Sequence, residues 1–458
     1  MTRSPAKIVA TVGPASSSAS ILSQMLGFNV DVVRINTSHG GPQQWSEIMA
    51  NVARAESVVG RRVGIAVDLE GPRVRTSNTA PVKLEKGETV TIGLNEGDIP
   101  VGVRQLFDAL DEGDIVLVDD GKIVLQVESV EGFRARARVM EGGVLGVRKG
   151  VVIRRKELDL PPVTPKDKEA LNFFSDKPVG HVYVSFARSP EHVERIRSLL
   201  ARLGLRHVRV YAKIESPRGV ERAGEIADAA DGVIVARGDL GMHYSLEEIP
   251  FVQERIVREA RRRNKAVVIA TEFLSSMVES PVPTRSEVVD IYQAVLQAAD
   301  ALLLTSETAV GKYPVKAVQW MSKITGRAYK KLLESPPSRG QAEGTLYKLA
   351  LGLVELAESL DAPLIVYSKT GRLAERIASF RPLKTFYTGV PNEVIERVVR
   401  HIWAAEPVVV GEHEYEEGLA RTYERVRREG YVGDDDVVVE AAWSRNKGIY
   451  IVRVRNLV

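Results

Sequence analysis

The sequence predicts an α/β protein built on a (β/α)8 TIM barrel, with a small β-barrel lid domain inserted in one barrel loop and an α/β domain after it. Eight short apolar segments alternate with helical periods through the first three quarters of the chain, and every segment ends in polar residues. One long stretch between them changes to period two. A linker rich in Pro and Gly precedes the last part.

The predicted barrel strands are IVATVGP, DVVRINTSHG, VGIAVDLEG, HVYVSFAR, VRVYAKIE, GVIVARGD, AVVIATE and ALLLTSET. Helical periods are expected over residues 16–26, 44–59, 190–203, 246–262 and 286–298. An open doubly wound sheet is the alternative, but it usually has fewer strands and often a glycine-rich dinucleotide loop. No two glycines in the sequence are separated by a single residue. A closed barrel, with its active site at the carboxyl ends of the strands, is therefore favoured.

The inserted domain is expected over residues 73–158, which leaves residues 1–72 and 159–335 for the barrel. Asp120-Gly121 and Glu131-Gly132 mark hairpins within the period-two stretch, and Pro161, Pro162 and Pro165 follow it. Because such a domain hangs over the active-site face, we expect it to act as a lid.

A helix expected from Val315 to Leu333 is followed by the linker SPPSRGQAEGT and a C-terminal α/β domain over residues 343–458. In this domain the strand PLIVY runs into SKTGRL at a helix start, Ser368–Leu373, with Lys369 and Arg372 adding positive charge. The turn is a candidate site for a phosphorylated effector. An ordinary capped helix is an equally good interpretation.

Composition excludes several classes of protein. The 458 residues carry a net charge of +3, so the charge balance indicates neither a nucleic-acid partner nor an acidic membrane. The absence of cysteine excludes disulfides, thiolate catalysis and zinc fingers. No apolar run approaches membrane-spanning length, and the N-terminal residues lack the apolar stretch of a secretory signal, so we expect a cytoplasmic protein.

The segment from Val208 to Gly241 brings three charged residues together. Lys213 and Glu215 are two residues apart at the end of one strand, and Asp239 lies just past the end of the next. In a right-handed parallel unit both strand ends lie on the same side. Two carboxylates with a lysine are the composition of a Mg²⁺ phosphoryl-transfer site, although a surface cluster of ion pairs has the same composition.

Further polar residues follow the neighbouring strands. Arg34, Asn36, Ser38 and His39 lie at the end of the second strand, and Asp68 ends the third. Arg34 stands in an otherwise apolar run, so it either pairs with a carboxylate or receives a phosphate. Thr271, Thr305 and Ser306 have no histidine beside them, which disfavours a serine hydrolase, and neither Gly121-Lys122 nor Gly311-Lys312 continues into a Walker A loop.

The runs AKIVATVGPAS, VVRINTSHG, DLEGPRVRT, VDDG, DLPPVTPKD, AKIESPRGV, DGVIVARGDLG, PTRSEVVD and SETAVGKYPVKAV resemble the pyruvate kinase family in order and in nearly every spacing. The resemblance covers the barrel and the insertion and is looser across the C-terminal domain. It implies transfer of the phosphoryl group of phosphoenolpyruvate to ADP, giving pyruvate and ATP, with Mg²⁺ or Mn²⁺. It also implies a homotetramer.

The resemblance assigns roles by position. Glu215 and Asp239 are similar to the family's Mg²⁺ ligands, Lys213 to the lysine that stabilises the moving phosphoryl group, and Arg34 to the phosphate-binding arginine. The backbone N–H groups of Gly238 and Asp239 resemble those that hold the substrate carboxylate, and Thr271 resembles the threonine near the protonated carbon. The nucleotide contacts it implies are Asn36, Thr37, Ser38, His39 and Arg75. The potassium site it implies is Asn36, Ser38 and Asp68.

The sequence also departs from the family pattern. Ser189 replaces a basic residue, Glu272 replaces glutamine, TSETA replaces SGETA, and Leu373 replaces the final serine of the sugar-phosphate loop. Leu69 and Arg73 stand where potassium-dependent members have threonine and an acidic residue. We therefore expect the Arg73 guanidinium to substitute for potassium, so that potassium is not required; the alternative is that Arg73 turns to solvent and the ion binds.

Two other classes of function remain open from the residues alone. A phosphoenolpyruvate-utilising dikinase or a Mg²⁺-dependent lyase would also place carboxylates and an arginine at barrel strand ends. A dikinase needs a phosphohistidine domain, which the positions of the seven histidines do not indicate. A non-catalytic binding protein is the third interpretation, and losses among Lys213, Glu215 and Asp239 would be expected of it.

Overall fold

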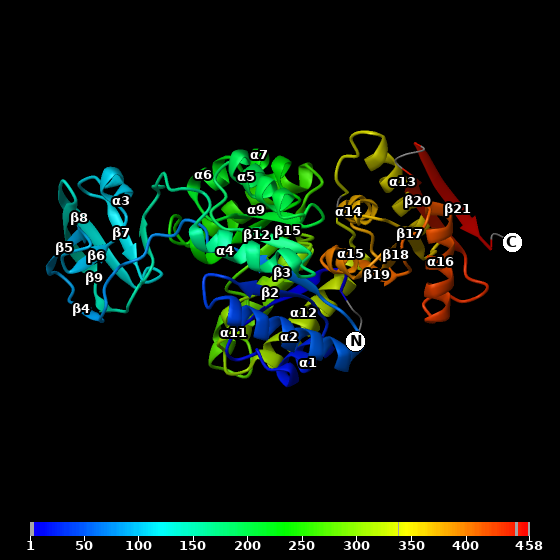
Figure 1. Ribbon diagram of the computed structural model, residues 1–458, viewed down its shortest axis with the longest axis horizontal. Helices are drawn as coiled ribbons and strands as arrows, with labels where there is room; N and C mark the ends of the chain where they lie inside the picture. Colours follow the sequence, from blue (N-terminus) through cyan, green and yellow to red (C-terminus); the bar gives the residue numbers. More distant parts are fainter. Residues whose placement is uncertain (1–3, 338, 445–447, 457–458) are drawn as a thin grey trace.

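The computed structural model describes residues 4–337, 339–444 and 448–456. The expectations for the extreme N-terminus, and parts of the predicted linker and C-terminal domain, therefore fall on residues outside these ranges. The molecule is elongated, with the inserted domain at one end, the barrel in the middle and the C-terminal domain at the other end (Figure 1).

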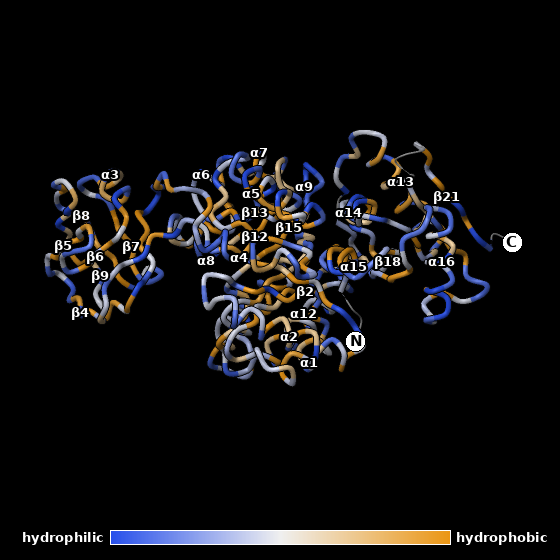
Figure 2. The backbone as a smooth tube through the Cα atoms, in the orientation of Figure 1, coloured by the Kyte–Doolittle hydropathy of each residue, from blue (hydrophilic) through white to orange (hydrophobic). Residues whose placement is uncertain are grey.

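The barrel is closed and all of its strands are parallel, in the order β1-β16-β15-β14-β13-β12-β3-β2. Its strands are β1 (Lys7–Val12), β2 (Val30–Asn36), β3 (Gly64–Asp68), β12 (His181–Val184), β13 (Arg209–Ile214), β14 (Gly232–Ala236), β15 (Ala266–Ala270) and β16 (Ala301–Leu304). Both faces of these strands are covered, so they are almost entirely apolar, and hydrophobic residues follow the strands through the centre of the molecule (Figure 2). The predicted barrel is confirmed over the open sheet.

The helices around the barrel agree with the predicted periods within a few residues, with three differences. The helices are α1 (Ala19–Gly27), α2 (Pro42–Val59), α4 (Pro165–Phe173), η1 (Phe174–Asp176), α5 (Pro190–Arg202), α6 (Pro217–Glu221), α7 (Ala223–Ala229), α8 (Arg237–Leu240), α9 (Ile249–Arg262), η2 (Ser275–Val278), α10 (Arg285–Leu296), α11 (Ser306–Ala309) and α12 (Pro314–Glu334). Helix α1 begins late because Ser18 caps it, accepting from the N–H of Ile21.

The amphipathic run that opens at Pro217 forms two helices, α6 and α7. Arg222 leaves helical geometry between α6 and α7, at φ −99° and ψ 17°. Both halves bury the same apolar face, so the hydrophobic period continues across the break. Helix α9 begins at Ile249 rather than Leu246, whose side chain is exposed.

The inserted domain is a small β structure with its own core. Six strands pair in the order β11-β7-β8-β9-β5-β6, and β10 pairs with β4. One short segment, Arg75 and Thr76, bridges the two edges of the six-stranded sheet. Arg75 pairs with Gly150 beside β11, and Thr76 pairs with Val101 of β6, so the sheet closes on itself through this segment. Its elements are β4 (Val82–Leu84), β5 (Thr89–Leu94), β6 (Ile99–Val101), α3 (Gln105–Ala109), β7 (Ile115–Val118), β8 (Ile123–Glu131), β9 (Arg134–Glu141), β10 (Gly143–Leu145) and β11 (Val151–Ile153).

The C-terminal domain is a five-stranded sheet in the order β19-β18-β17-β20-β21, parallel except for its last strand. Its elements are α13 (Thr345–Ser359), β17 (Leu364–Tyr367), α14 (Arg372–Ser379), β18 (Phe386–Val390), α15 (Glu393–Val399), β19 (Ala405–Val409), α16 (Tyr415–Arg428), β20 (Val438–Ser444) and β21 (Ile449–Arg455). Among the described residues, no helix is long and apolar enough to cross a membrane.

The two attached domains pack differently. The inserted domain has a hydrophobic cluster of its own, from Val74 to Ile153. In the C-terminal domain, one set of buried residues joins the cluster of the outer barrel, whereas a second cluster, which includes Ile365, Tyr367 and Leu419, belongs to this domain alone. We propose domain boundaries at residues 1–72 with 159–335, 73–158 and 343–458. The C-terminal domain thus shares part of its core with the barrel, which the inserted domain does not.

Candidate active site

The predicted site residues meet at the carboxyl ends of the barrel strands. Lys213, near the end of β13, places its Nζ atom 2.8 Å from Glu215 Oε1, 3.6 Å from Asp68 Oδ1 and 3.0 Å from Ser185 Oγ. Burial alone would lower the pKa of Lys213, but the negative charges of Asp68 and Glu215 outweigh it and raise the pKa. Lys213 is therefore a fixed positive charge in a nearly dry site.

Glu215 and Asp239 are candidate metal ligands from neighbouring strand ends. The backbone N–H of Phe186 donates to Glu215 Oε2 at 2.5 Å, while the buried Oε1 atom is paired with Lys213 at 2.8 Å. Burial raises the pKa of Glu215 to about 7 against the charge of Lys213, and the charge of Asp239 adds to the rise. Burial alone would also raise the pKa of Asp239, but Arg73 and Lys213 lower it.

These two carboxylates fit a hard divalent cation. Such a cation prefers carboxylate oxygens. Burial and the charge of Asp239 both raise the pKa of Glu215, so a divalent cation between the two carboxylates would relieve an unfavourable concentration of negative charge. Within the described part of the chain no group of three or more His, Cys, Asp or Glu side chains is arranged around one point. Glu215 and Asp239 would therefore hold the ion together with oxygens of water or substrate, which is how Mg²⁺ is usually bound.

Arg34 pairs with a carboxylate, which was one of its two predicted states. Its Nε and Nη2 atoms lie 2.6 and 2.5 Å from Asp68 Oδ2, and its Nη1 donates to Thr11 Oγ1 at 2.8 Å. The fork-shaped contact fixes the guanidinium at the floor of the mouth. Thr11, at the end of β1, was not singled out from the sequence.

Gly238 and Thr271 are hydrogen-bonded to each other. The Gly238 N–H donates to Thr271 Oγ1 at 2.8 Å. Thr271 and Glu272 have φ angles of 71° and 60°, a conformation that is costly for a β-branched residue and typical of functional sites. Arg237, which sequence reasoning missed, donates to the Thr271 carbonyl at 2.6 Å and pairs with Asp290 at 2.7 Å, so it holds this turn in place.

The loop after β2 carries the predicted nucleotide-binding residues. Asn36 Oδ1 accepts from the Ser38 N–H at 3.1 Å, and the Thr37 hydroxyl donates to the Asp68 carbonyl at 2.8 Å. Burial, with the charges of Arg75 and Lys166, lowers the pKa of His39, so the imidazole is neutral near pH 7.

Lys166 was another residue missed. Its Nζ atom donates to the Ser38 carbonyl at 3.0 Å, and α4, which carries it, begins with a capping box between Thr164 and Asp167. The segment VTPKD shows this capping pattern in the sequence. Arg75, at the start of the inserted domain, lies 3.8 Å from Glu70, and its charge acts on His39.

The predicted position of Arg73 was wrong. Its guanidinium neither joins Asn36, Ser38 and Asp68 nor turns to solvent; it forms an ion pair with Asp239 and lies 5.5 Å from the centre of the Phe186 ring. Asp68 already has Arg34 and Lys213 as partners. Arg73 therefore pairs with Asp239, the neighbouring carboxylate, rather than with Asp68.

Two other departures have local explanations. Ser189 lies outside the hydrogen-bonded core of the mouth and precedes α5, while Arg188 before it donates to the carbonyls of Leu158 and Leu160 and so fixes the returning end of the insertion. The turn Ser368–Leu373 leads into α14, where Arg372 pairs with Asp231 at 2.7 Å and Glu375 at 3.0 Å. An effector site at this turn stays a prediction.

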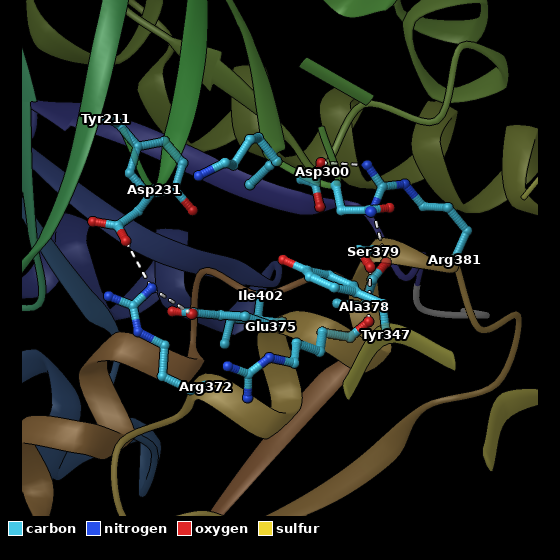
Figure 3. A pocket seen from close by; sticks show the side chains of 14 residues that line it. Tyr211, Asp231, Asp300, Tyr347, Arg372, Glu375, Ala378, Ser379, Arg381 and Ile402 are labelled. Carbon is cyan, nitrogen blue, oxygen red and sulfur yellow. Dashed lines mark hydrogen bonds and ion pairs between the residues drawn. The ribbon is translucent and has the colours of Figure 1, made fainter. Parts of the chain in front are cut away.

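Arg372 also lines a cavity of about 200 Å³ between the barrel and the C-terminal domain, at the opposite end of the barrel from Lys213. In Figure 3, Arg372 faces Asp231 and Glu375 on one side of the cavity, while Arg381 faces Asp300 on the other. The cavity is polar, and it contains none of the predicted catalytic residues. Arg372 and Arg381 have carboxylate partners, whereas the buried Nη1 atom of Arg376, which also lines the cavity, has no hydrogen-bond partner among the described residues.

The fold and the mouth together define a class: a (β/α)8-barrel enzyme built for a highly anionic substrate, with two carboxylates able to hold a divalent cation under an inserted β domain. A sequence model described as "Pyruvate kinase, barrel domain" matches residues 3–318. The pyruvate kinase of Aeropyrum pernix is 71% identical over 455 residues, covering 99% of both chains. That of Pyrobaculum aerophilum is 36% identical, covering 92% of this chain and 91% of its own length.

The crystal structure of the Pyrobaculum aerophilum pyruvate kinase superposes with a TM-score of 0.89, at 34% sequence identity, and covers 99% of this chain and all of its own. The chain belongs to the pyruvate kinase family. It is a phosphotransferase of glycolysis, and neither the dikinase nor the lyase alternative is supported.

Proposed function

We propose that this mouth transfers the phosphoryl group of phosphoenolpyruvate to ADP through Lys213, Arg34 and Thr271, with Mg²⁺ or Mn²⁺ at Glu215 and Asp239. The observation that carries the proposal is the position of Lys213 Nζ, 2.8 Å from Glu215 and 3.6 Å from Asp68 in a buried site. A bound divalent cation would neutralise phosphate and carboxylate oxygens of the substrate. Lys213 and Arg34 supply preorganised positive charge for the phosphoryl group in transfer.

The substrate carboxylate is proposed to bind the turn that starts α8. Gly238 and Asp239 lie in α8, directly after the end of β14, and the Gly238 N–H donates to Thr271 Oγ1 at 2.8 Å. A carboxylate that took this N–H would release the threonine hydroxyl. Thr271 is then free to position the proton that converts enolpyruvate to pyruvate.

ADP is proposed to bind the loop of Asn36, Thr37, Ser38 and His39 together with Arg75. The support is electrostatic, since Arg75 and the loop anchor Lys166 both lower the pKa of His39. Lys166 touches the loop backbone, so it is a positioning residue for the nucleotide rather than a contact to it.

Lys213→Met tests the chemistry. We expect at least a hundredfold loss of turnover, about 3 kcal/mol, with phosphoenolpyruvate binding retained, because the lysine charge is needed most in the transition state. A coupled assay for pyruvate measures turnover and calorimetry measures binding, with Lys168→Met on the outer face of α4 as the matched control. Turnover within a fewfold of wild type would remove Lys213 from the mechanism.

The metal assignment has its own test. Glu215→Gln and Asp239→Asn keep the side-chain shapes but remove the charges that attract the cation. Both should need far more Mn²⁺ to reach half-maximal signal in a direct binding titration without substrates. An unchanged titration in both variants would place the ion elsewhere.

Potassium independence remains a proposal after the correction to Arg73. The guanidinium of Arg73 adds a positive charge at the mouth through its ion pair with Asp239, and a positive charge there disfavours a second monovalent cation nearby. We expect full activity with tetramethylammonium as the sole monovalent cation. Strong activation by added potassium would show that Asn36, Ser38 and Asp68 still bind the ion.

We further propose a cytoplasmic homotetramer. Large apolar side chains are exposed on the barrel segment from residue 246 to residue 310, which is more apolar surface than single scattered residues require. These residues are Leu246, Phe251, Val282, Val289 and Val310. Sedimentation equilibrium measures the mass, and a monomer at micromolar concentration would contradict the proposal.

A further inference from the structure

Arg73 connects the inserted domain to one of the two candidate metal ligands. It is the first residue of that domain, and its guanidinium forms an ion pair with Asp239 at the barrel mouth. The two side chains are 30% and 23% exposed, so the contact is partly shielded but open to exchange. An ion pair in this position ties the entry strand of the insertion to the barrel.

The ion pair completes a charge pattern. Each of the two candidate metal ligands is paired with a positively charged side chain. Lys213 lies 2.8 Å from Glu215, and Arg73 pairs with Asp239. A cation that binds Asp239 would have to approach within a few ångström of the Arg73 guanidinium. Like charges so close repel strongly in a partly dry site.

Phe186 shapes the position of Arg73. Its φ angle of 53° is unusual for a bulky residue, and this conformation points its N–H at Glu215 Oε2, 2.5 Å away. Its ring lies under the Arg73 guanidinium, with 5.5 Å to the ring centre. Phe186 thus contacts both ion pairs. Its N–H donates to Glu215, which is paired with Lys213, and its ring packs against Arg73, which is paired with Asp239.

At the returning end of the inserted domain, Arg188 of the barrel donates to the Leu158 carbonyl, and further contacts between the domain and the barrel mouth are at the surface. Arg155 lies 3.1 Å from Glu248, with side chains 63% and 39% exposed. Gly121, in a hairpin turn, faces Met242. The separate hydrophobic core of the inserted domain means that no shared core would hold it if the Arg73 contact opened.

We propose that the Arg73–Asp239 ion pair is a latch that holds the inserted domain at the barrel mouth in the metal-free protein and is released when a divalent cation takes Asp239. The proposal rests on the metal assignment to Glu215 and Asp239 made above. It adds that metal binding and the position of the lid are coupled through this chain's own arginine. The cation then competes with the latch, and the lid is freed before substrates bind.

The first test is Mn²⁺ binding without substrates, followed by the electron paramagnetic resonance signal of the free ion. Arg73→Met should tighten Mn²⁺ binding about tenfold, because a competing guanidinium is removed. The Mn²⁺ affinity of Arg73→Lys should lie between those of wild type and Arg73→Met. Lysine keeps the positive charge but loses the two-pronged contact of the guanidinium and its flat packing on the Phe186 ring. Arg155→Met is the matched control and should bind Mn²⁺ like wild type.

The second test measures the lid directly. Because the chain has no cysteine, Glu112→Cys on the inserted domain and Ser198→Cys on α5 give two unique spin-label sites, both exposed. Electron–electron distance measurements should give a narrow distribution without metal and a broader one with Mg²⁺. The Arg73→Met protein should show the broad distribution without any metal.

The outcomes separate the latch from the metal site. Equal or weaker Mn²⁺ binding in Arg73→Met would overturn the competition. Tighter binding with an unchanged distance distribution would overturn the coupling to the inserted domain. If Glu215→Gln and Asp239→Asn bind Mn²⁺ like wild type, the metal assignment itself fails, whatever Arg73 does.

Discussion

The barrel carries a domain at each end, and the two are attached by opposite means. The C-terminal domain shares a hydrophobic cluster with the barrel and is joined to it by buried ion pairs, Arg381 to Asp300 at 2.6 Å and Arg397 to Glu56 at 2.6 Å. The inserted domain keeps its own core and touches the barrel through partly exposed ion pairs of Arg73 and Arg155. The first attachment fixes a domain and the second allows it to move.

Close backbone packing adds to the difference. A Cβ atom at Gly180 would lie 3.0 Å from the carbonyl carbon of Arg397. The end of α15 therefore packs so closely against the barrel that only glycine fits at position 180 without a shift of the backbone. Lys7 also donates to the Ala405 carbonyl at 2.8 Å. Charged side chains are therefore structural at one end of the barrel and exchangeable at the other.

Breaking the fixed attachment should have the largest effect. Arg381→Met leaves the buried Asp300 carboxylate without its cation, which costs about 3–5 kcal/mol. We expect a clear fall in the thermal unfolding midpoint by calorimetry, with kcat per folded molecule unchanged. Adding Asp300→Asn, which keeps an acceptor for the Val267 N–H, should recover part of the loss. A midpoint unchanged by Arg381→Met would contradict the fixed attachment.

Acid should weaken the same end of the barrel. His401, from the C-terminal domain, is fully buried, and burial lowers its pKa to about 4. The unfolded chain, with a pKa near 6.5, therefore takes up a proton first, so stability is complete above about pH 6.5 and declines as the pH falls toward 4. This histidine alone accounts for about 2 kcal/mol between pH 7 and pH 5.

The slope of stability against pH checks this sign. His401→Gln keeps an acceptor for Tyr183 but cannot be charged, so its unfolding midpoint should fall less between pH 7 and pH 5 than that of wild type. Groups near His401 are His181, Tyr211, Asp31 and Lys7, and His181 also has a pKa lowered by burial. Equal slopes would assign the acid sensitivity to those neighbours.

A smaller loss of stability is expected from a substitution inside the barrel, at its contact with the C-terminal domain. Tyr183 lies in β12, and its hydroxyl is 2.7 Å from His401 Nε2. Since His401 is neutral, Tyr183→Phe removes one neutral hydrogen bond, worth about 1 kcal/mol, whichever of the two groups donates. We expect a slightly lower unfolding midpoint and unchanged KM for both substrates. A large change in KM would mean that the C-terminal domain reaches the mouth through this residue.

The loose attachment should give the smallest effect. Arg155→Met removes an exposed ion pair with Glu248. Exposed ion pairs typically contribute less than about 1 kcal/mol to stability. The unfolding midpoint should remain within about 1 °C, and the salt dependence of turnover should stay the same. A loss as large as that of Arg381→Met would show that the inserted domain is also held rigidly.

The sequence was informative where side chains follow the ends of apolar strands. Lys213, Glu215 and Asp239 were expected together from spacing alone, and the structure brings them together. The barrel and the hairpin turns of the insertion also follow from periodicity and turn residues. These features are local, so short stretches of sequence specify them.

The features that were missed depend on distant pairing. The partner of Arg73 lies 166 positions away, and its choice depends on Arg34 and Lys213 having already taken Asp68. The attachment of the C-terminal domain had a signal that went unused: Asp31, Asp231 and Asp300 lie at the starts of strands. Each accepts a backbone N–H of the adjacent strand, from Ile8, Val210 and Val267 respectively.

The hydrogen-bonded base of the inserted domain bears on how the barrel assembles. Strands β3 and β12 must pair across more than a hundred residues of intervening chain, which is a costly loop to close. The two ends of the insertion bond to each other, from the Val151 N–H to the Val74 carbonyl at 3.0 Å. Once the insertion has folded on its own core, the connection between β3 and β12 behaves as a short loop. The lid thus lowers the entropic cost of closing the barrel beneath it.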